Sequence, residues 1–412
     1  MGQRVAVTGL GVISPCGNTI NHFSTNIFSG RSGVRKISSA LGKTLSVKVA
    51  AEVDFSPFDY FSDRQVSTMD RISQFALAAG SQAWKDRGLI LDIPERVRAG
   101  VYLGAGMGGA STIEEVYDRL FRKKLDRVKP LSVLMIMPSS AASLLSIEYG
   151  LSGPCLTFST ACSSSANAIG EAYRQIRDGY ADVMLVGGAE AFLTYGGFRC
   201  WEAMRILAPE DPDDPSKSCK PFSKDRSGIV LGEGAAMLVL EELSLAIRRG
   251  ASIYGEVIGY GITSDSFHIT KPSLEGQVRA MSQALKDAEI SPEDVDYINA
   301  HGTATQWNDL IETQAIKKVF GDYAYKVPIS STKSMLGHAI GAAGAMELLI
   351  ALLAIKNQAI PPTTNLDLPD PECDLDYVPN SARQSVKVNI VMSNSFAFGG
   401  TNAVLIVRRL TK

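Results

Sequence analysis

The sequence predicts an α/β fold made of two similar α/β halves, and three observations support this. The chain has 412 residues, of which 45% are hydrophobic and 20% charged, so it can bury a large core. Short apolar runs alternate with helix-length segments, as in α/β proteins with largely parallel strands. The length suits two fused halves, which we place at residues 1–250 and 251–412.

The individual elements follow from this alternation. Strands buried on both faces are expected where apolar runs end in glycine or a polar residue, at residues 5–9, 101–104, 183–187 and 390–394. Helices are expected in the segments between them, at residues 71–87, 139–149, 164–178, 277–288 and 309–320. The second half is expected to begin near residues 253–257. Two proline-rich stretches, 209–227 and 365–384, are interpreted as surface loops.

Charge, cysteine content and hydropathy limit the possible partners and the cellular compartment of the protein. A formal net charge of −2 argues against nucleic acid as a partner. The six cysteines lack the paired spacing of zinc sites, and residues 1–11 lack the pattern of a secretory signal, so we expect a reducing cytoplasm. The most apolar stretch, residues 339–355, is short for a membrane span and contains Glu347. It is therefore expected to be a buried core helix, with no membrane involved.

Cys162 is the candidate nucleophile. It lies between the apolar residues 156–158 and a helical pattern, so its sulfur is expected at a strand-to-helix turn, where the helix dipole favours the thiolate. The alternative is a buried cysteine that packs like alanine. The surrounding Thr-Ala-Cys-Ser-Ser-Ser sequence and two histidine motifs elsewhere in the chain favour the nucleophile.

Two histidines stand in motifs that contain glycine. His301 follows the predicted strand at 295–300 and begins a turn rich in hydroxyl groups, where the chain can approach a ligand closely. A histidine that only satisfies its hydrogen bonds at a strand end is the alternative. His338 precedes a helix start, where the positive potential holds an imidazole neutral and leaves it able to donate a hydrogen bond. Since a thiol needs a base or a positive site, the fold must bring both rings to the sulfur.

Three further features surround these motifs. Glu347 needs a partner on so apolar a helix, and Lys333 is the nearest cation in sequence. We interpret the pair as support for the histidines, with an unrelated salt bridge as the alternative.

In residues 394–402 glycines follow Phe398, which allows a backbone N–H to point into a site as an oxyanion hole requires; a hairpin turn is the alternative. The glycine-rich residues 104–109 lack the spacing of nucleotide-binding loops, so no nucleotide site is expected.

Together these motifs resemble the β-ketoacyl-[acyl-carrier-protein] synthases of the thiolase superfamily, and most closely their FabF-like (KAS II) branch. The resemblance covers essentially the whole chain and includes residues 5–11, 221–234 and 394–402. It implies a thiolase-like fold in a layered αβαβα arrangement, with the nucleophile in the N-terminal half and the catalytic histidines in the C-terminal half. It also implies a dimer, and the sequence leaves open whether the chain pairs with itself or with a related ketosynthase-like subunit.

The resemblance further implies a reaction. Cys162 takes an acyl group from a carrier-protein thioester, and malonyl-carrier protein loses carbon dioxide to give a carbanion that attacks the acyl-enzyme. His301 and His338 polarise the malonyl carbonyl, Lys333 orders them, and the N–H groups of Cys162 and Phe398 form the oxyanion hole. No cofactor is implied beyond the phosphopantetheine arm of the carrier protein. The residues counted as substrate-binding are Thr303, Thr305, Met107 and Glu347, the last through its support of the histidines.

Carrier proteins are acidic, so a local basic patch is expected to receive them. The candidates are Arg64, Arg127, Lys129 and Arg205. Ser67 and Thr68 stand where FabF-like enzymes often carry basic docking residues, Gln306 begins a segment that replaces the usual Pro-x-Gly-Asp, and Ala397 replaces a common glycine. These departures, with the serines after the cysteine, favour a polyketide or polyene pathway over primary fatty-acid synthesis.

Two other functions stay open at this point. A non-catalytic subunit similar to chain-length factors would not need the cysteine and the two histidines, so their retention argues against it. A thiolase acting on coenzyme A esters would use a second cysteine as acid and base, and Cys373 lies in an acidic loop instead of a glycine-rich motif. We therefore expect a catalytically competent acyltransferase.

Overall fold

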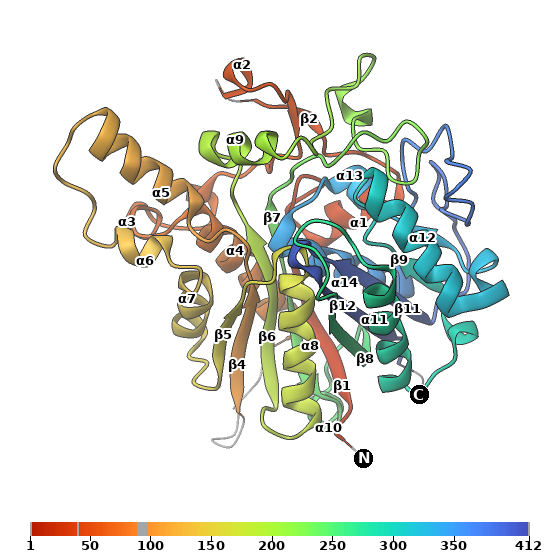
Figure 1. Ribbon diagram of the computed structural model, residues 1–412. Coiled ribbons are helices and arrows are strands. Elements are labelled where there is room, and N and C mark those ends of the chain that lie inside the picture. The colour runs from red at the N-terminus through yellow and green to blue at the C-terminus, as the bar shows by residue number, and fades with distance from the viewer. Residues whose placement is uncertain (1, 39–40, 89–97, 411–412) are drawn as a thin grey trace.

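A ten-stranded mixed sheet forms the centre of the computed structural model, which describes residues 2–38, 41–88 and 98–410. The strand order is β10-β9-β11-β12-β8-β1-β7-β6-β4-β5 (Figure 1). The strands of the first half are β1 (Val5–Ile13), β4 (Ala99–Gly104), β5 (Cys155–Phe158), β6 (Val183–Glu190) and β7 (Gly234–Glu242). Those of the second half are β8 (Gly255–Ser264), β9 (Tyr297–Asn299), β10 (Ile329–Ser330), β11 (Ile390–Phe396) and β12 (Thr401–Arg408). A separate small sheet pairs β2 (Arg35–Lys36) with β3 (Val49–Ala50).

Both halves use the same pattern of strand directions. β4 is parallel to β5 and β6, and β9 is parallel to β10 and β11. β7 and β12 run antiparallel to both of their neighbours, and the halves join through a short antiparallel pairing of β1 with β8. The expectation of largely parallel strands was therefore wrong for the strands near the join. In the second half the cause is the short connection from β11 to β12, because a parallel pair needs a long crossover.

The helices complete a layered arrangement. α8 (Ser164–Arg177) and α14 (Ala343–Asn357) pack against each other and against strands of both halves, so they form the middle layer. α4 (Arg71–Asp86) and α7 (Ser140–Tyr149) cover the outer face of the first set of strands. α11 (Leu274–Asp287), with α12 (Gln306–Phe320) beside it, covers the second set. The layers follow the order αβαβα, and each predicted helix is present to within one turn.

The shorter helices lie around this core. They are α1 (Ile20–Phe28), α2 (Leu41–Thr44), α3 (Asp63–Ser67), α5 (Ala110–Tyr117), α6 (Ser132–Ile136), α9 (Tyr195–Ala203), α10 (Leu243–Arg248) and α13 (Lys333–Leu336). A π-helical turn, η2 (Asp118–Arg122), extends α5. Figure 1 shows α5, α6 and the loop between them standing out from the body of the molecule. We call this segment, residues 110–137, the arm.

Glycines repeat at equivalent places in the two halves. A Cβ added to Gly9 or Gly11 in β1 would lie 2.2 or 2.0 Å from carbonyl oxygens of α4. A Cβ added to Gly259 or Gly261 in β8 would lie 2.5 or 2.0 Å from carbonyl oxygens of α11. Only glycine permits this backbone contact between strand and helix. The halves therefore share this close glycine contact between strand and helix, as well as a strand order, although the sequence shows no tandem repeat.

The most apolar segment is a core helix, as expected. Residues Ile340–Asn357 are long and apolar enough to cross a membrane, but 89% of this window is buried inside the fold. The prediction of surface loops at 209–227 and 365–384 was wrong in part, because the two stretches pack on each other. Phe222 and Tyr377 are buried and stack with their ring centroids 3.7 Å apart, and Arg226 pairs with Asp370.

Candidate active site

The turn between β5 and α8 presents Cys162. Ala161 has a φ of +49°, a left-handed conformation that costs a residue with a Cβ about 1 kcal/mol or more. Ser164 holds the turn, since its Oγ donates to the carbonyl of Ala161 at 2.6 Å and accepts from the N–H of Thr160 at 2.9 Å. The strained turn leaves the thiol buried, with 3% of Cys162 exposed.

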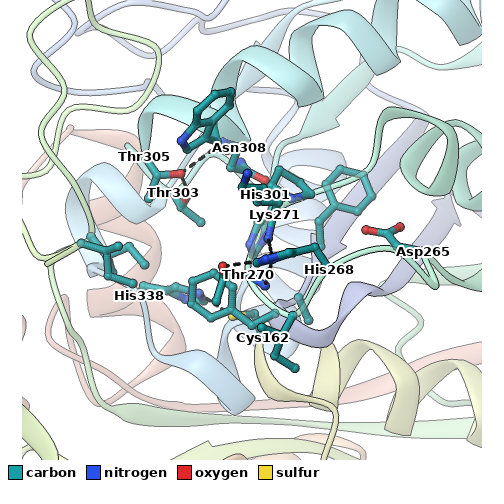
Figure 2. A pocket seen from close by; sticks show the side chains of 18 of the residues that line it. Cys162, Asp265, His268, Thr270, Lys271, His301, Thr303, Thr305, Asn308 and His338 are labelled. Carbon is teal, nitrogen blue, oxygen red and sulfur yellow. Dashed lines mark hydrogen bonds between the residues drawn. The ribbon is translucent and has the colours of Figure 1, made fainter. Parts of the chain in front are cut away.

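Both motif histidines lie beside this sulfur. The Nε2 atom of His338 is 3.0 Å from the Sγ atom of Cys162. The ring of His301 meets that of His338 edge to face, with centroids 5.4 Å apart. Figure 2 shows the three side chains on one side of the same pocket. The fold thus brings together residues from the β5–α8 turn, the loop after β9 and the turn before α14.

Lys333 and Glu347 order His301. The Nζ of Lys333 donates to the carbonyl oxygen of His301 at 2.5 Å, to its Nδ1 at 3.3 Å, and to Oε1 of Glu347. An ammonium group has three donors and no acceptor, so Nδ1 of His301 must be the acceptor. The proton of the neutral ring is therefore on Nε2. Lys333 and Glu347 are both buried and neither lines the cavity. Lys333 contacts His301 directly, and Glu347 acts through its ion pair with Lys333.

Burial controls the charge of both imidazoles. It lowers the pKa of His301 well below its usual value, and the charges of Lys333 and of the neighbouring ring lower it further. Burial, followed by the charge of Lys333, has the same effect on the pKa of His338. Each ring is thus neutral at physiological pH, with one N–H donor and one acceptor nitrogen.

The cysteine does not have the charge that the sequence predicted. Burial raises the pKa of the Cys162 thiol to about 11, although Lys333 and the N–H groups of Phe398 and Cys162 itself lower it. Desolvation therefore outweighs the charge of Lys333 and the two N–H groups in the free enzyme, and the resting sulfur carries its proton. His338, at hydrogen-bond distance, is placed to receive that proton.

The loop after β11 supplies a backbone donor. The N–H of Phe398 points at the sulfur, as does the N–H of Cys162, and together they have the arrangement of an oxyanion hole. Gly399 and Gly400 have φ values of +82° and +75°, which favour glycine. The N–H of Gly399 donates to the carbonyl of Ile269 at 2.8 Å, which ties this loop to the segment after β8.

A cavity of about 440 Å³ leads from the surface to the sulfur. Its lining includes the cysteine and both histidines, which are almost fully buried, and Trp307, which is 65% exposed. Thr303 and Thr305 lie in the same lining, with their hydroxyl oxygens 2.9 Å apart. Figure 2 shows both threonines at the upper left of the pocket, beside His301, and Cys162 near its lower edge. The site therefore has a buried reactive end, a polar wall and an exposed mouth.

Other residues named from the sequence lie outside this cavity. Met107 lines a second cavity of about 860 Å³, together with Ala110, Glu114, Tyr195 and Cys200. The basic candidates for carrier docking are all exposed: Arg64, Arg127, Lys129 and Arg205. These four assignments, and the role of Met107, stay predictions.

Two buried carboxylates that the sequence did not single out hold the His301 loop. Glu312 accepts the N–H groups of His301 and Gly302, each at 2.8 Å. Asp309 accepts the N–H of Thr303 at 3.0 Å. Their spacing of three residues puts both on one face of α12, and this spacing is the feature of the sequence from which they could have been predicted.

The cysteine and the two histidines are also the group of candidate metal ligands found among the described residues. Their ligand atoms lie within 4.8 Å of one another, and three such ligands are enough to hold zinc. However, the ammonium group of Lys333 lies 3.3 Å from His301 and repels a divalent cation. The prediction of a metal-free site stays a prediction.

Two family models match the chain in sequence order. The beta-ketoacyl synthase N-terminal domain matches residues 2–246, and the beta-ketoacyl synthase C-terminal domain matches residues 254–367. The chain belongs to the β-ketoacyl synthase family. As a β-ketoacyl synthase it is an acyltransferase.

Several relatives align over nearly their whole length. The 3-oxoacyl-[acyl-carrier-protein] synthase 2 of Coxiella burnetii is 44% identical, over 99% of this chain and 99% of that protein. The enzyme of the same name from Synechocystis sp. is 42% identical, over 99% and 98%. Among solved structures, the ketosynthase AntDE with its type II carrier protein AntF and the ishigamide ketosynthase/chain length factor are each 36% identical over 100% of both chains, with TM-scores of 0.92 and 0.93. These neighbours confirm the predicted fold class.

Proposed function

We propose that this β-ketoacyl synthase condenses malonyl-[acyl-carrier-protein] with an acyl group held on Cys162 and lengthens the acyl chain by two carbons. The observation that carries the proposal is the 3.0 Å contact between Sγ of Cys162 and Nε2 of His338, with the ring of His301 beyond it. The curated relatives bear names that specify acyl-carrier-protein substrates.

Acyl transfer comes first. The thiol of Cys162 passes its proton to Nε2 of His338 as the sulfur attacks the carbonyl carbon of the incoming thioester. The N–H groups of Cys162 and Phe398 stabilise the oxyanion that forms. The carrier thiolate then leaves and takes the proton from His338, which returns the ring to its neutral state.

Condensation follows. The bond from the malonyl methylene carbon to its carboxylate breaks, carbon dioxide leaves, and negative charge develops on the thioester oxygen. Neutral His301 donates its Nε2–H to this oxygen. Once the sulfur is acylated and no longer offers a proton, the neutral ring of His338 exchanges its proton from Nδ1 to Nε2 through solvent and becomes the second donor. The methylene carbon attacks the acyl carbonyl, the carbon–sulfur bond to Cys162 breaks, and the thiolate takes up a proton from solvent.

The substrates reach the site on the phosphopantetheine arm of the carrier protein, and no other cofactor is required. An arm entering past Trp307 meets the hydroxyl groups of Thr303 and Thr305 before the sulfur, and these hydroxyls suit its amide groups. The cysteines of the described chain are free, which suits a reducing cytoplasm.

A dimer is part of this proposal, formed through the arm and the edge of β5. Phe121 and Val133 on the arm are 74% and 64% exposed, and Leu156 on the edge strand is 51% exposed. Exposed apolar residues on an unpaired strand edge and a protruding segment favour a protein partner. Because the chain keeps a full set of catalytic groups, a second copy is the proposed partner. A related subunit is the alternative, since two solved neighbours are ketosynthases with a chain length factor.

Acylation of the cysteine tests the proposal. Wild-type enzyme incubated with acyl-carrier proteins is expected to gain the mass of one acyl group, and Cys162→Ala is expected to gain none, because no other group stores the acyl chain. Cys373→Ala, at a buried cysteine outside both cavities, is the matched control and should load normally. Intact-mass measurement over a panel of fatty acyl, polyketide and polyene carriers also identifies the pathway. Loading of Cys162→Ala would contradict the proposal, and a chain that never loads would support the non-catalytic subunit.

A further inference from the structure

Glu190, the last residue of β6, is a buried carboxylate held by backbone groups. Its side chain is 0% exposed, and no ion pair reaches it among the described residues. The N–H groups of Gly106 and Gly341 donate to Oε2 at 2.8 and 3.0 Å, and the N–H of Met107 donates to Oε1 at 3.0 Å. Three amide dipoles thus compensate a group that is costly to bury.

The three donors come from two loops that serve different cavities. Met107 lines the 860 Å³ cavity beside the arm, whereas Gly341 is three residues after His338. The loops are in backbone contact across the carboxylate, because a Cβ on Gly341 would lie 2.5 Å from the N atom of Gly106 and 2.7 Å from Glu190. Neither loop can shift without breaking hydrogen bonds to the same carboxylate.

An apolar cluster spans the same two regions. It contains Cys162, Ile340 and Ala110, and it is fully or almost fully buried. Cys162 lines the reactive cavity, Ala110 lines the second cavity, and Ile340 has a φ of +40° in the turn after His338. A change in the second cavity can therefore reach His338 through contacts between these buried apolar side chains, as well as through the hydrogen bonds of Glu190.

We propose that Glu190 is a positioning residue that couples the Met107 loop to the His338 loop, so that the contents of the second cavity affect the condensation geometry at Cys162. The residue touches no reacting atom and acts through the backbone. The functional part of this inference rests on the proposed function, in which an acyl chain bound at Cys162 is followed by condensation.

Hydrogen exchange tests the coupling without a substrate. Glu190→Gln keeps the size of the side chain but replaces one acceptor oxygen with a donor. We expect amide exchange to quicken at least about tenfold in peptides containing residues 106–107 and also in those containing residue 341. Asp296→Asn is the matched control, because Asp296 also accepts two backbone N–H groups, from Asn389 and Ile390, away from both cavities. Faster exchange in one loop only, or in neither, would overturn the proposal.

Kinetics provide the second readout. In Glu190→Gln we expect the kcat for malonyl decarboxylation to fall at least about tenfold and the preference among acyl chain lengths to flatten. A merely structural role would instead lower every rate by one common factor. If wild-type enzyme loads no acyl group, the proposed function is wrong. The hydrogen-exchange experiment needs no substrate, so it still tests whether Glu190 couples the two loops.

A second variant, Gly341→Ala, tests the coupling if Glu190→Gln does not fold. Gly341→Ala places its Cβ against Gly106 and Glu190 and is expected to quicken exchange at residues 106–107 as well as at its own loop. Disturbance confined to its own loop would overturn the coupling.

Discussion

At the residue scale, the reactivity of the site depends on burial. Removing Cys162, His301 and His338 from water keeps the thiol protonated and both rings neutral. A neutral ring can donate a hydrogen bond to an enolate oxygen without a counter-charge, which suits decarboxylation. Lys333 contributes by fixing which nitrogen of His301 carries the proton.

His338→Ala separates the two half-reactions. We expect malonyl decarboxylation to fall by about 100-fold or more, because one donor to the enolate oxygen is lost. Acyl transfer loses the acceptor of the thiol proton but should fall less than decarboxylation, since the sulfur and both backbone donors of the oxyanion hole remain. Carbon dioxide release and intact mass measure the two steps, with His22→Ala on the exposed side of α1 as the control. Equal loss of both steps would disprove the division of labour.

At the scale of elements, the middle-layer helix α8 connects the core to the nucleophile turn. Tyr260 on β8 donates its hydroxyl to Asn167 at 2.7 Å, and Asn167 donates to Thr160 at 2.8 Å, just before the turn. Gly170 on α8 leaves room for the tyrosine ring. The helix therefore sets the position of Cys162 through packing as well as through its N-terminus.

Gly170→Ala tests this packing. A Cβ at this position would lie 2.4 Å from ring atoms of Tyr260, which is buried and has little room to move. Overpacking of this kind costs about 1–3 kcal/mol, so the midpoint of urea unfolding should fall and acylation should slow. Gln175→Ala on the same helix, at a partly exposed position, should change neither. Unchanged stability in Gly170→Ala would show that the ring can shift freely.

At the scale of the whole molecule, the buried histidines make stability depend on pH. Their folded pKa values lie well below 6.5, so below that pH the unfolded chain binds protons that the folded chain does not. The contribution of the two rings to the free energy of unfolding should therefore decrease as pH falls below about 6.5, by up to about 1.4 kcal/mol per pH unit for each ring. Urea unfolding between pH 5 and 7.5 should show a shallower slope for His338→Asn. Glu190 and Glu347, with raised pKa values near 7, act in the opposite direction but are present in both proteins. Identical slopes would mean that the pKa of the ring is the same in the folded and unfolded states.

Assembly belongs to the same scale. Leu156→Lys places a charge on the edge of β5 and is expected to turn a dimer into a monomer at micromolar concentration, as measured by sedimentation velocity. Ile247→Lys, on the exposed face of α10, which packs against β1 and β7, should leave the dimer intact. A variant that stays dimeric would exclude this edge as the interface.

The sequence alone was enough to predict what depends on local pattern. Apolar runs and helix-length segments located β1, β4, β6, β11 and the major helices. The motifs around Cys162, His301 and His338 identified the residues that meet at the sulfur, because a reaction of this kind needs those residue types in small, flexible surroundings.

Other properties were decided only by the tertiary structure, because they depend on which distant groups become neighbours and how much water they exclude. The direction of β7 and β12, the packing of the two proline-rich stretches and the glycine repeat require strand and loop partners that no local pattern specifies. The protonated state of Cys162 required its depth of burial. Glu190 became recognisable only when the backbone N–H groups that it holds were in place.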